Sequence, residues 1–194
     1  MIGTPLIRGQ NLPKMLPEVD KGREFFDIMW WVARDVWCPG SKGPDYPDWA
    51  RGHSWIRYDE WQVSRTKTPC GENLQNLMLS TLPPDTWWWG LADDNLPTPG
   101  FFKALREEAD AGAEVVVFPC QHSSGLLKSE AEAMHRGRVD GSQVAFKKSV
   151  AGDLRWVGDD ACVDGVFVEE LYKRCPEKFR FRQEPVLGYN ALRP

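Results

Sequence analysis

The fold of this chain is decided by one stretch, Trp87-Trp88-Trp89-Gly90-Leu91-Ala92-Asp93-Asp94-Asn95-Leu96-Pro97. An apolar, aromatic run ends abruptly in two carboxylates, which predicts a buried strand with acids at its carboxyl end. In open α/β sheets ligands bind at this edge, and carboxylates there can hold a divalent cation beside a phosphate group. We therefore expect Asp93 and Asp94 to belong to a functional site. The alternatives are that they cap the next helix or lie in a solvated turn.

The composition is that of an ordinary globular protein. The chain has 194 residues, of which 42% are hydrophobic and 27% charged, and its formal net charge of −4 does not indicate nucleic-acid binding. Its five cysteines lack any Cys-x-x-Cys pairing, which favours reduced thiols over a disulfide framework or a zinc site. We find no signal peptide and no run long enough to span a membrane. We therefore expect one compact cytoplasmic domain over residues 1–194.

Helix and strand patterns alternate along the chain. Strand patterns occupy residues 1–7, 26–33, 87–91, 113–119 and 142–147. Helical spacing of apolar residues occupies 12–24, 72–82, 100–111 and 165–174. A stretch rich in Gly, Pro and Trp at about 36–57 predicts a long loop, and ordered loops of that length are often functional. The alternation predicts an α/β fold with a mostly parallel sheet flanked by helices.

The order of these segments resembles the GT-A fold of nucleotide-sugar glycosyltransferases, and most of all the family 2 type. Four segments carry the resemblance: Ile2–Pro5, Asp93–Pro97, Gly137–Phe146, and Val163–Leu171 followed by 181–190. It implies a Rossmann-like domain that moves a sugar, such as a hexose, from a nucleotide-diphosphate donor to an acceptor hydroxyl. It also implies Mn²⁺ or Mg²⁺ as the cofactor. Inversion is the favoured outcome, because a base on the acceptor side is the inverting design.

The resemblance also assigns residues on the donor side. Thr4 and Pro5 lie in the segment that passes the nucleotide in that family. The family's Asp-x-Asp motif is not literal here, because Ala92 stands where its first acid would fall. The run is instead similar to the Ala-Asp-Asp-Asp-Asn run of glucuronyltransferases. This similarity implies that Asp94 binds the metal and that Asp93 orients the nucleotide ribose.

Three further donor-side candidates follow from their positions. Asp35 ends the second predicted strand, where it could meet the base or ribose of a nucleotide. Lys67 precedes a predicted helix, where a cation could bind phosphate. His122 follows a predicted strand and is a candidate metal or phosphate ligand. Each of the three could equally be a solvated or structural residue.

The acceptor side needs a base, because the acceptor hydroxyl must lose its proton as it attacks. Asp164, just before a predicted helix, is our candidate, with Asp160 and Asp159 as rivals. A helix N-terminus lowers the pKa of an acid, so Asp164 would need partial burial to remain an effective base. Asp164 could instead be a helix N-cap, and the two rivals could be loop acids.

Two other functions stay open at the level of sequence. A nucleotidyltransferase shares the fold and the metal carboxylates, but such enzymes usually carry a Gly-rich loop with Lys or Arg after the first strand, and only Arg8-Gly9 is present. A binding module for nucleotides or carbohydrates could also have kept this fold without turnover.

Nine of the ten tryptophans fall into two groups. Those in strand-like runs are expected in the core. The other group, in or beside the long loop, contains Trp37, Trp49, Trp55 and Trp61. These side chains could form either a surface on which the acceptor stacks or a hydrophobic lid that fixes the loop.

Overall fold

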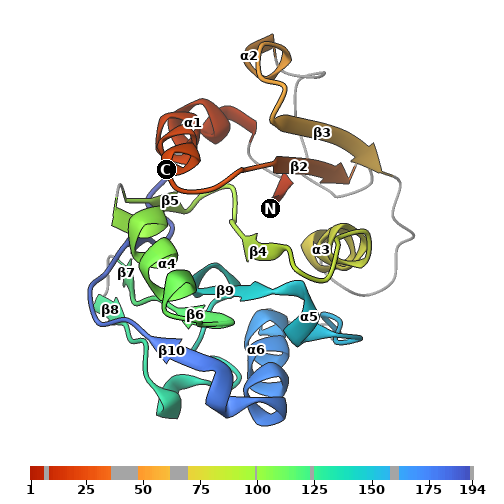
Figure 1. Cartoon of the computed structure of the whole chain (residues 1–194). Helices are drawn as coiled ribbons and strands as arrows, with labels where there is room; N and C mark the ends of the chain where they lie inside the picture. The colour runs from red at the N-terminus through yellow and green to blue at the C-terminus, as the bar shows by residue number, and fades with distance from the viewer. Residues whose placement is uncertain are drawn as a thin grey trace.

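The computed structural model describes residues 1–6, 9–35, 48–61, 70–98, 100–122, 125–157 and 162–192 (Figure 1). Its α-helices are α1 (Leu12–Lys21), α2 (Asp48–Arg51), α3 (Cys70–Ser80), α4 (Gly100–Asp110), α5 (Lys148–Ala151) and α6 (Val163–Arg174). Its strands are β1 (Ile2–Leu6), β2 (Trp30–Asp35), β3 (Ile56–Trp61), β4 (Trp87–Gly90), β5 (Leu96–Pro97), β6 (Val115–Val117), β7 (Cys120–His122), β8 (Gly125–Leu127), β9 (Val144–Lys147), β10 (Phe179–Phe181) and β11 (Leu187–Gly188).

Within these residues the main sheet has seven strands in the order β10-β6-β9-β4-β1-β2-β3. Neighbouring strands are parallel except for β9, which runs antiparallel between β4 and β6. The amino end of β9 therefore meets the carboxyl ends of β4 and β6 at one edge of the sheet. A smaller sheet, β5-β11-β7-β8, lies beside that edge. The predicted α/β class, with a mostly parallel sheet flanked by helices, is confirmed.

Each face of the main sheet packs against its own helices. The apolar residues of α1 and α4 join the core on one face, and those of α3 and α6 join the core on the other (Figure 1). Successive side chains in a strand point to opposite faces, so Trp30 and Trp31 enter different cores, as do Trp89 and Trp88. All four are buried, which confirms the prediction that the strand tryptophans build the core.

Two predicted boundaries differ from the structure. The second strand begins at Trp30 rather than at Phe26, because the Phe26 N–H donates to the Gly22 carbonyl (3.1 Å) in a turn that precedes the strand. The predicted loop at 36–57 contains α2 and the start of β3, while residues 36–47 lie outside the described parts of the chain. β3 was missed because it is an edge strand with alternating charged residues, such as Arg57 and Asp59.

Of the loop tryptophans, Trp55 has a clear place in the fold. It is buried, and its ring stacks 6.4 Å from that of Trp30 in the core on the α1 side. Trp55 therefore packs as a core residue.

Among the described helices, none has the length and apolar character required to cross a lipid bilayer.

A glycine in β1 allows the closest approach across the sheet core, and its substitution gives a stability prediction. A Cβ atom at Gly3 would lie 2.0 Å from the Trp88 ring, so the strand or the indole must shift in Gly3→Ala. We expect the free energy of unfolding to fall by roughly 1–3 kcal/mol or more, as in other overpacked cores. Urea unfolding measures this. Gly52→Ala is the control, because a Cβ there meets nothing within 4 Å; an equal loss in both variants would contradict the prediction.

Candidate active site

β4 delivers two buried acids to the carboxyl edge of the sheet. Asp93 and Asp94 are the central residues of a turn, which is closed by a hydrogen bond from the Asn95 N–H to the Ala92 carbonyl (3.1 Å). The two acids are only 2% and 3% exposed. They are therefore not in a solvated turn, and α4 begins beyond them at Gly100, so they do not cap it. Both alternatives considered for this pair from the sequence are wrong.

Ser142 holds this acidic turn against the start of β9. Its hydroxyl accepts hydrogen bonds from the Ala92 N–H (3.3 Å) and from the Asn95 side-chain amide (2.9 Å). Its carbonyl accepts from the Trp89 indole (2.7 Å), and its N–H donates to the Asp140 carboxylate (2.9 Å). One buried serine thus joins the turn, the last part of β4 and a third acid.

Asp140 belongs to a capping box in front of β9. It is the N-cap of a short 3-10 helix at Gly141–Gln143, and the Gln143 side chain accepts from the Asp140 N–H (3.0 Å). The same glutamine donates to the Phe118 carbonyl at the end of β6 (3.0 Å). Sequence reasoning did not single out Asp140, although the Asp-x-x-Gln spacing of a capping box marks it.

The last described segment folds back over the acidic turn. The Asn190 N–H donates to the Asn95 side-chain oxygen (2.8 Å), and the Leu192 N–H donates to the Asp94 carbonyl (3.0 Å). Asn190 has a φ of 53°, in the left-handed region that asparagine tolerates better than most residues. The turn is therefore held from one side by Ser142 and from the other by residues almost a hundred positions later in the chain.

Of the predicted donor-side residues, the structure brings β1 and the acidic turn together. The Asn11 side-chain amide, just after β1, donates to the Asp93 carbonyl (3.0 Å). Thr4 is buried and its hydroxyl accepts from the Trp30 indole (2.9 Å), while Pro5 is half-buried in the same strand. Contacts of Thr4, Pro5 and Asp93 with a nucleotide stay predictions.

Several predicted residues fall outside the described parts of the chain. Lys67 and the rival bases Asp159 and Asp160 lie in such segments. Asp35 ends β2, at the same edge of the sheet as the acidic turn, but its side chain is not among those described.

Asp164 reaches the Asp140 segment from α6. The N-cap of α6 is Cys162, which makes no side-chain cap, and Asp164 lies within the first turn, so the alternative that Asp164 is the N-cap is wrong. Its carboxyl packs directly on Gly141, where a Cβ atom would lie 2.8 Å from the Asp164 Cγ. Only glycine at position 141 leaves room for this carboxyl.

The two acids of this segment are strongly perturbed. The pKa of Asp164 is raised to about 7, chiefly by burial and then by the charge of Asp140, against smaller opposing effects of the Trp156 indole and the Gly141 N–H. The pKa of Asp140 is also raised, because burial outweighs its hydrogen bonds with Ser142, and the charge of Asp94 adds to the effect. The partial burial that Asp164 needed in order to act as a base is therefore present.

The acids fit a divalent cation. Asp94 is buried, and no lysine or arginine of the described residues is among the groups that shift the pKa of Asp140 or Asp164. Buried carboxylates without a cation are costly, and Mg²⁺ or Mn²⁺ needs only one or two protein carboxylates when phosphate oxygens and waters complete its shell. Within the described ranges no three His, Cys, Asp or Glu side chains gather as a metal site, so Asp94 would act with few protein ligands.

A cavity of about 310 Å³ opens beside Asp140 and Asp164, and its walls include His122, Arg138 and Tyr189. The Tyr189 side chain hydrogen-bonds to Asp140, and its ring centroid lies 5.2 Å from that of His122. A cavity of this size matches a sugar-sized ligand. His122 thus lies on the Asp164 side of the site, and its role as a metal or phosphate ligand stays a prediction.

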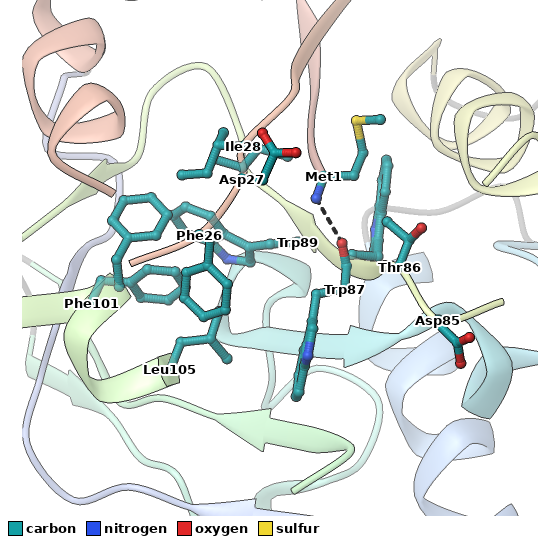
Figure 2. A pocket seen from close by; sticks show the side chains of 13 residues that line it. Met1, Phe26, Asp27, Ile28, Asp85, Thr86, Trp87, Trp89, Phe101 and Leu105 are labelled. Atoms are coloured by element: carbon teal, nitrogen blue, oxygen red, sulfur yellow. Dashed lines mark hydrogen bonds between the residues drawn. The ribbon is translucent and has the colours of Figure 1, made fainter. Parts of the chain in front are cut away.

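A second cavity, of about 270 Å³, lies at the opposite edge of the sheet, where β1 and β4 begin (Figure 2). Its walls are mainly apolar and include Phe26, Trp87 and Phe101, and the Met1 amino group donates to the Trp87 carbonyl (2.8 Å). Asp93, Asp94, Asp140 and Asp164 do not line it. The candidate active site is therefore at the carboxyl edge.

Removing the Ser142 hydroxyl tests whether it holds the site together. In Ser142→Ala, the Ala92 N–H and the Asn95 amide lose a buried acceptor, which costs about 1–3 kcal/mol in the free energy of unfolding. We also expect weaker binding of nucleotide with Mn²⁺, measured by calorimetry. Ser149→Ala is the control, because Ser149 is exposed on α5. Wild-type stability and binding in Ser142→Ala would refute this role.

Comparison with known proteins gives matches by structure alone. No protein-family model matches the sequence, and no curated protein matches it significantly. Among solved structures, residues 1–349 of S. aureus TarS in complex with UDP superpose with a TM-score of 0.69 at 9% identity, over 97% of this chain and 59% of that one. A mannosyltransferase from Pyrobaculum calidifontis in complex with GDP-Man and Mn²⁺ gives 0.68 at 17% identity, over 97% of this chain and 56% of that one.

A third similar structure is named for nucleotidyl transfer rather than for glycosyl transfer. A Bacillus anthracis protein assigned as a glucose-1-phosphate thymidylyltransferase superposes with a TM-score of 0.52 at 8% identity, over 96% of this chain and 88% of that one. This chain spans less than two thirds of the TarS and mannosyltransferase chains. At identities this low the likeness shows the fold and nothing further. The chain has the GT-A fold of nucleotide-sugar glycosyltransferases.

Proposed function

We propose that this chain is a metal-dependent glycosyltransferase that moves a sugar from a nucleotide-diphosphate donor to an acceptor hydroxyl, with inversion at the anomeric carbon. The observation that carries the proposal is the meeting of Asp94 and Asp164 at one sheet edge, with Asp140 between them and a cavity on the Asp164 side. One acid serves the donor and the other the acceptor.

On the donor side, Asp94 would hold the cation and Asp93 would orient the ribose. A bound Mn²⁺ or Mg²⁺ supplies positive charge beside the diphosphate as that group leaves. The proposal is supported by the burial and rigid mounting of both acids, since a carboxylate fixed at a strand end keeps its geometry. It is also supported by the UDP, UDP-GlcNAc and GDP-Man bound in structures of similar fold.

On the acceptor side, the acceptor hydroxyl would enter the cavity beside Asp164. Its oxygen forms a bond to the anomeric carbon while the bond from that carbon to the diphosphate oxygen breaks, and the nucleoside diphosphate leaves. The proton of the hydroxyl passes to the Asp164 carboxylate. An acid whose pKa is near 7 is well matched to this transfer, because a substantial fraction of it is ionised at neutral pH and that carboxylate is still basic enough to accept a proton.

Product assays distinguish the proposed function from the two alternatives. A nucleotidyltransferase would release pyrophosphate from a nucleoside triphosphate and a sugar phosphate, whereas a binding module would turn over nothing. A glycosyltransferase should release nucleoside diphosphate from a nucleotide sugar in the presence of Mn²⁺. Background rates with every nucleotide sugar tried would count against the proposal.

Asp94 carries the metal part of the proposal. In Asp94→Ala we expect nucleotide binding to become insensitive to Mn²⁺, because the variant lacks the carboxylate that would hold the ion. Titration calorimetry with UDP and GDP, with and without EDTA, measures this. Asp85→Ala removes an exposed acid before β4 and should keep the metal dependence. Metal-dependent binding that survives in Asp94→Ala would rule out this ligand.

Asp164 carries the acceptor part. In Asp164→Asn we expect donor binding to persist and the transfer rate to fall roughly 10²–10⁴-fold, the usual contribution of a general base. The wild-type rate should rise with pH through an apparent pKa near 7, because the carboxyl is protonated and inactive below that value. A pH profile of kcat tests both points, and full activity in Asp164→Asn would transfer the role of base to Asp160 or another group.

A further inference from the structure

The cavity beside Asp164 has an unused cation on its wall. Arg138 lines this cavity, is exposed, and makes no side-chain hydrogen bond or ion pair with any residue in the described parts of the chain. Most other arginines of the described parts have carboxylate partners, such as Arg174 with Asp153 (2.7 Å) and Arg182 with Glu108 (3.1 Å). The guanidinium of Arg138 is therefore available to a ligand.

The backbone of Arg138 is fixed against the helix that carries Asp164. Its N–H donates to the His135 carbonyl (3.1 Å), which closes a turn. Gly137 in that turn has a φ of 79°, where a side chain would be strained. The turn packs closely on α6, since a Cβ atom at Gly165 would lie 2.9 Å from the Gly137 nitrogen. Arg138 and Asp164 thus keep a fixed spatial relation.

We propose that Arg138 binds an anionic group of the acceptor, a phosphate or a carboxylate, whose neighbouring hydroxyl is presented to Asp164. A guanidinium binds both anions through paired N–H donors, which adds orientation to affinity. This inference rests on the proposed glycosyltransferase function and names the class of its acceptor.

The charged residues around the cavity indicate that the anionic group bound by Arg138 belongs to the acceptor and not to the donor. The cavity lining contains Arg138, Asp140 and Asp164 but neither Asp93 nor Asp94, to which the donor diphosphate is assigned above. The two acids would repel an anion elsewhere in the cavity, so the anion is confined to the side of Arg138. A volume of about 310 Å³ accommodates one sugar unit with such a group.

Three probes with one carbon skeleton test the inference: glucose, glucose 6-phosphate and glucuronate. They share most hydroxyls and differ in carrying no anion, a phosphate or a carboxylate. The first measurement follows the Arg138 Nε–H resonance by NMR, assigned as the peak missing from Arg138→Gln. The second compares kcat/KM of the three as acceptors, with UDP-GlcNAc and GDP-mannose as donors.

We expect at least one anionic probe to shift the Arg138 resonance at a lower concentration than glucose, and the anion that does so identifies the group recognised. We expect its kcat/KM advantage over glucose to fall about tenfold in Arg138→Gln, in line with the loss of a charge-assisted contact. Arg138→Lys should keep part of it. The control Lys103→Gln, which removes a charge from an exposed position of α4, should keep all of it.

The outcomes separate this inference from the proposed function. Equal resonance shifts and equal kcat/KM values for all three probes, with turnover present, would overturn the anion site and leave the glycosyltransferase proposal standing. Shifts of the Arg138 resonance by an anionic probe, with no nucleotide-sugar turnover under any condition, would overturn the acceptor role.

Discussion

The candidate site depends on the hydrogen bonds of one buried hydroxyl. Ser142 lies where the antiparallel strand β9 starts, and this end of β9 faces the end of β4 because the strands are neighbours of opposite direction. Its hydroxyl therefore reaches both flanks of the Asp93–Asp94 turn while its N–H reaches Asp140. If β9 ran parallel to β4, its first residues would lie at the opposite edge of the sheet, away from the Asp93–Asp94 turn. The antiparallel direction of β9 is thus what brings a third acid to the site.

This arrangement gathers acidic side chains where they are largely removed from solvent. Burial is the largest cause of the raised pKa of Asp140 and of Asp164; the charge of Asp94 raises the pKa of Asp140 further, and the charge of Asp140 raises that of Asp164. Hydrogen bonds from Ser142 and Tyr189 to Asp140 offset part of this cost. A cation bound at Asp94 would offset more of the cost of ionising these carboxyl groups. The cluster that disfavours ionisation without a metal ion would therefore favour binding of one.

The sequence predicted those parts of the site that are local in the chain. A strand followed by acids, and an acid at the start of a helix, are patterns within about ten residues, and they make both Asp93–Asp94 and Asp164 candidates from sequence. Tyr189 and Asn190 could not be found in this way, because their roles arise from contacts with Asp140 and Asn95 far away in the sequence. The strands of the small sheet are also only two or three residues long, too short to show alternation.

Aromatic residues pack around α6 beside Asp164, an acid whose pKa is raised although it lies in the first turn of a helix. A helix dipole alone would lower the pKa of Asp164 and make it a poor proton acceptor. Trp156 stacks flat on Phe167, with ring centroids 3.9 Å apart and planes 4° from parallel, and Phe167 lies on the turn of α6 that follows Asp164. The Asn76 side chain fixes the Trp156 backbone with two hydrogen bonds of 2.8 Å. The Trp156 indole is among the groups that affect the pKa of Asp164, so this aromatic wall lies beside the carboxyl, and burial is the largest cause of its raised pKa. The tryptophan content of the chain thus contributes to the chemistry of the site as well as to the core.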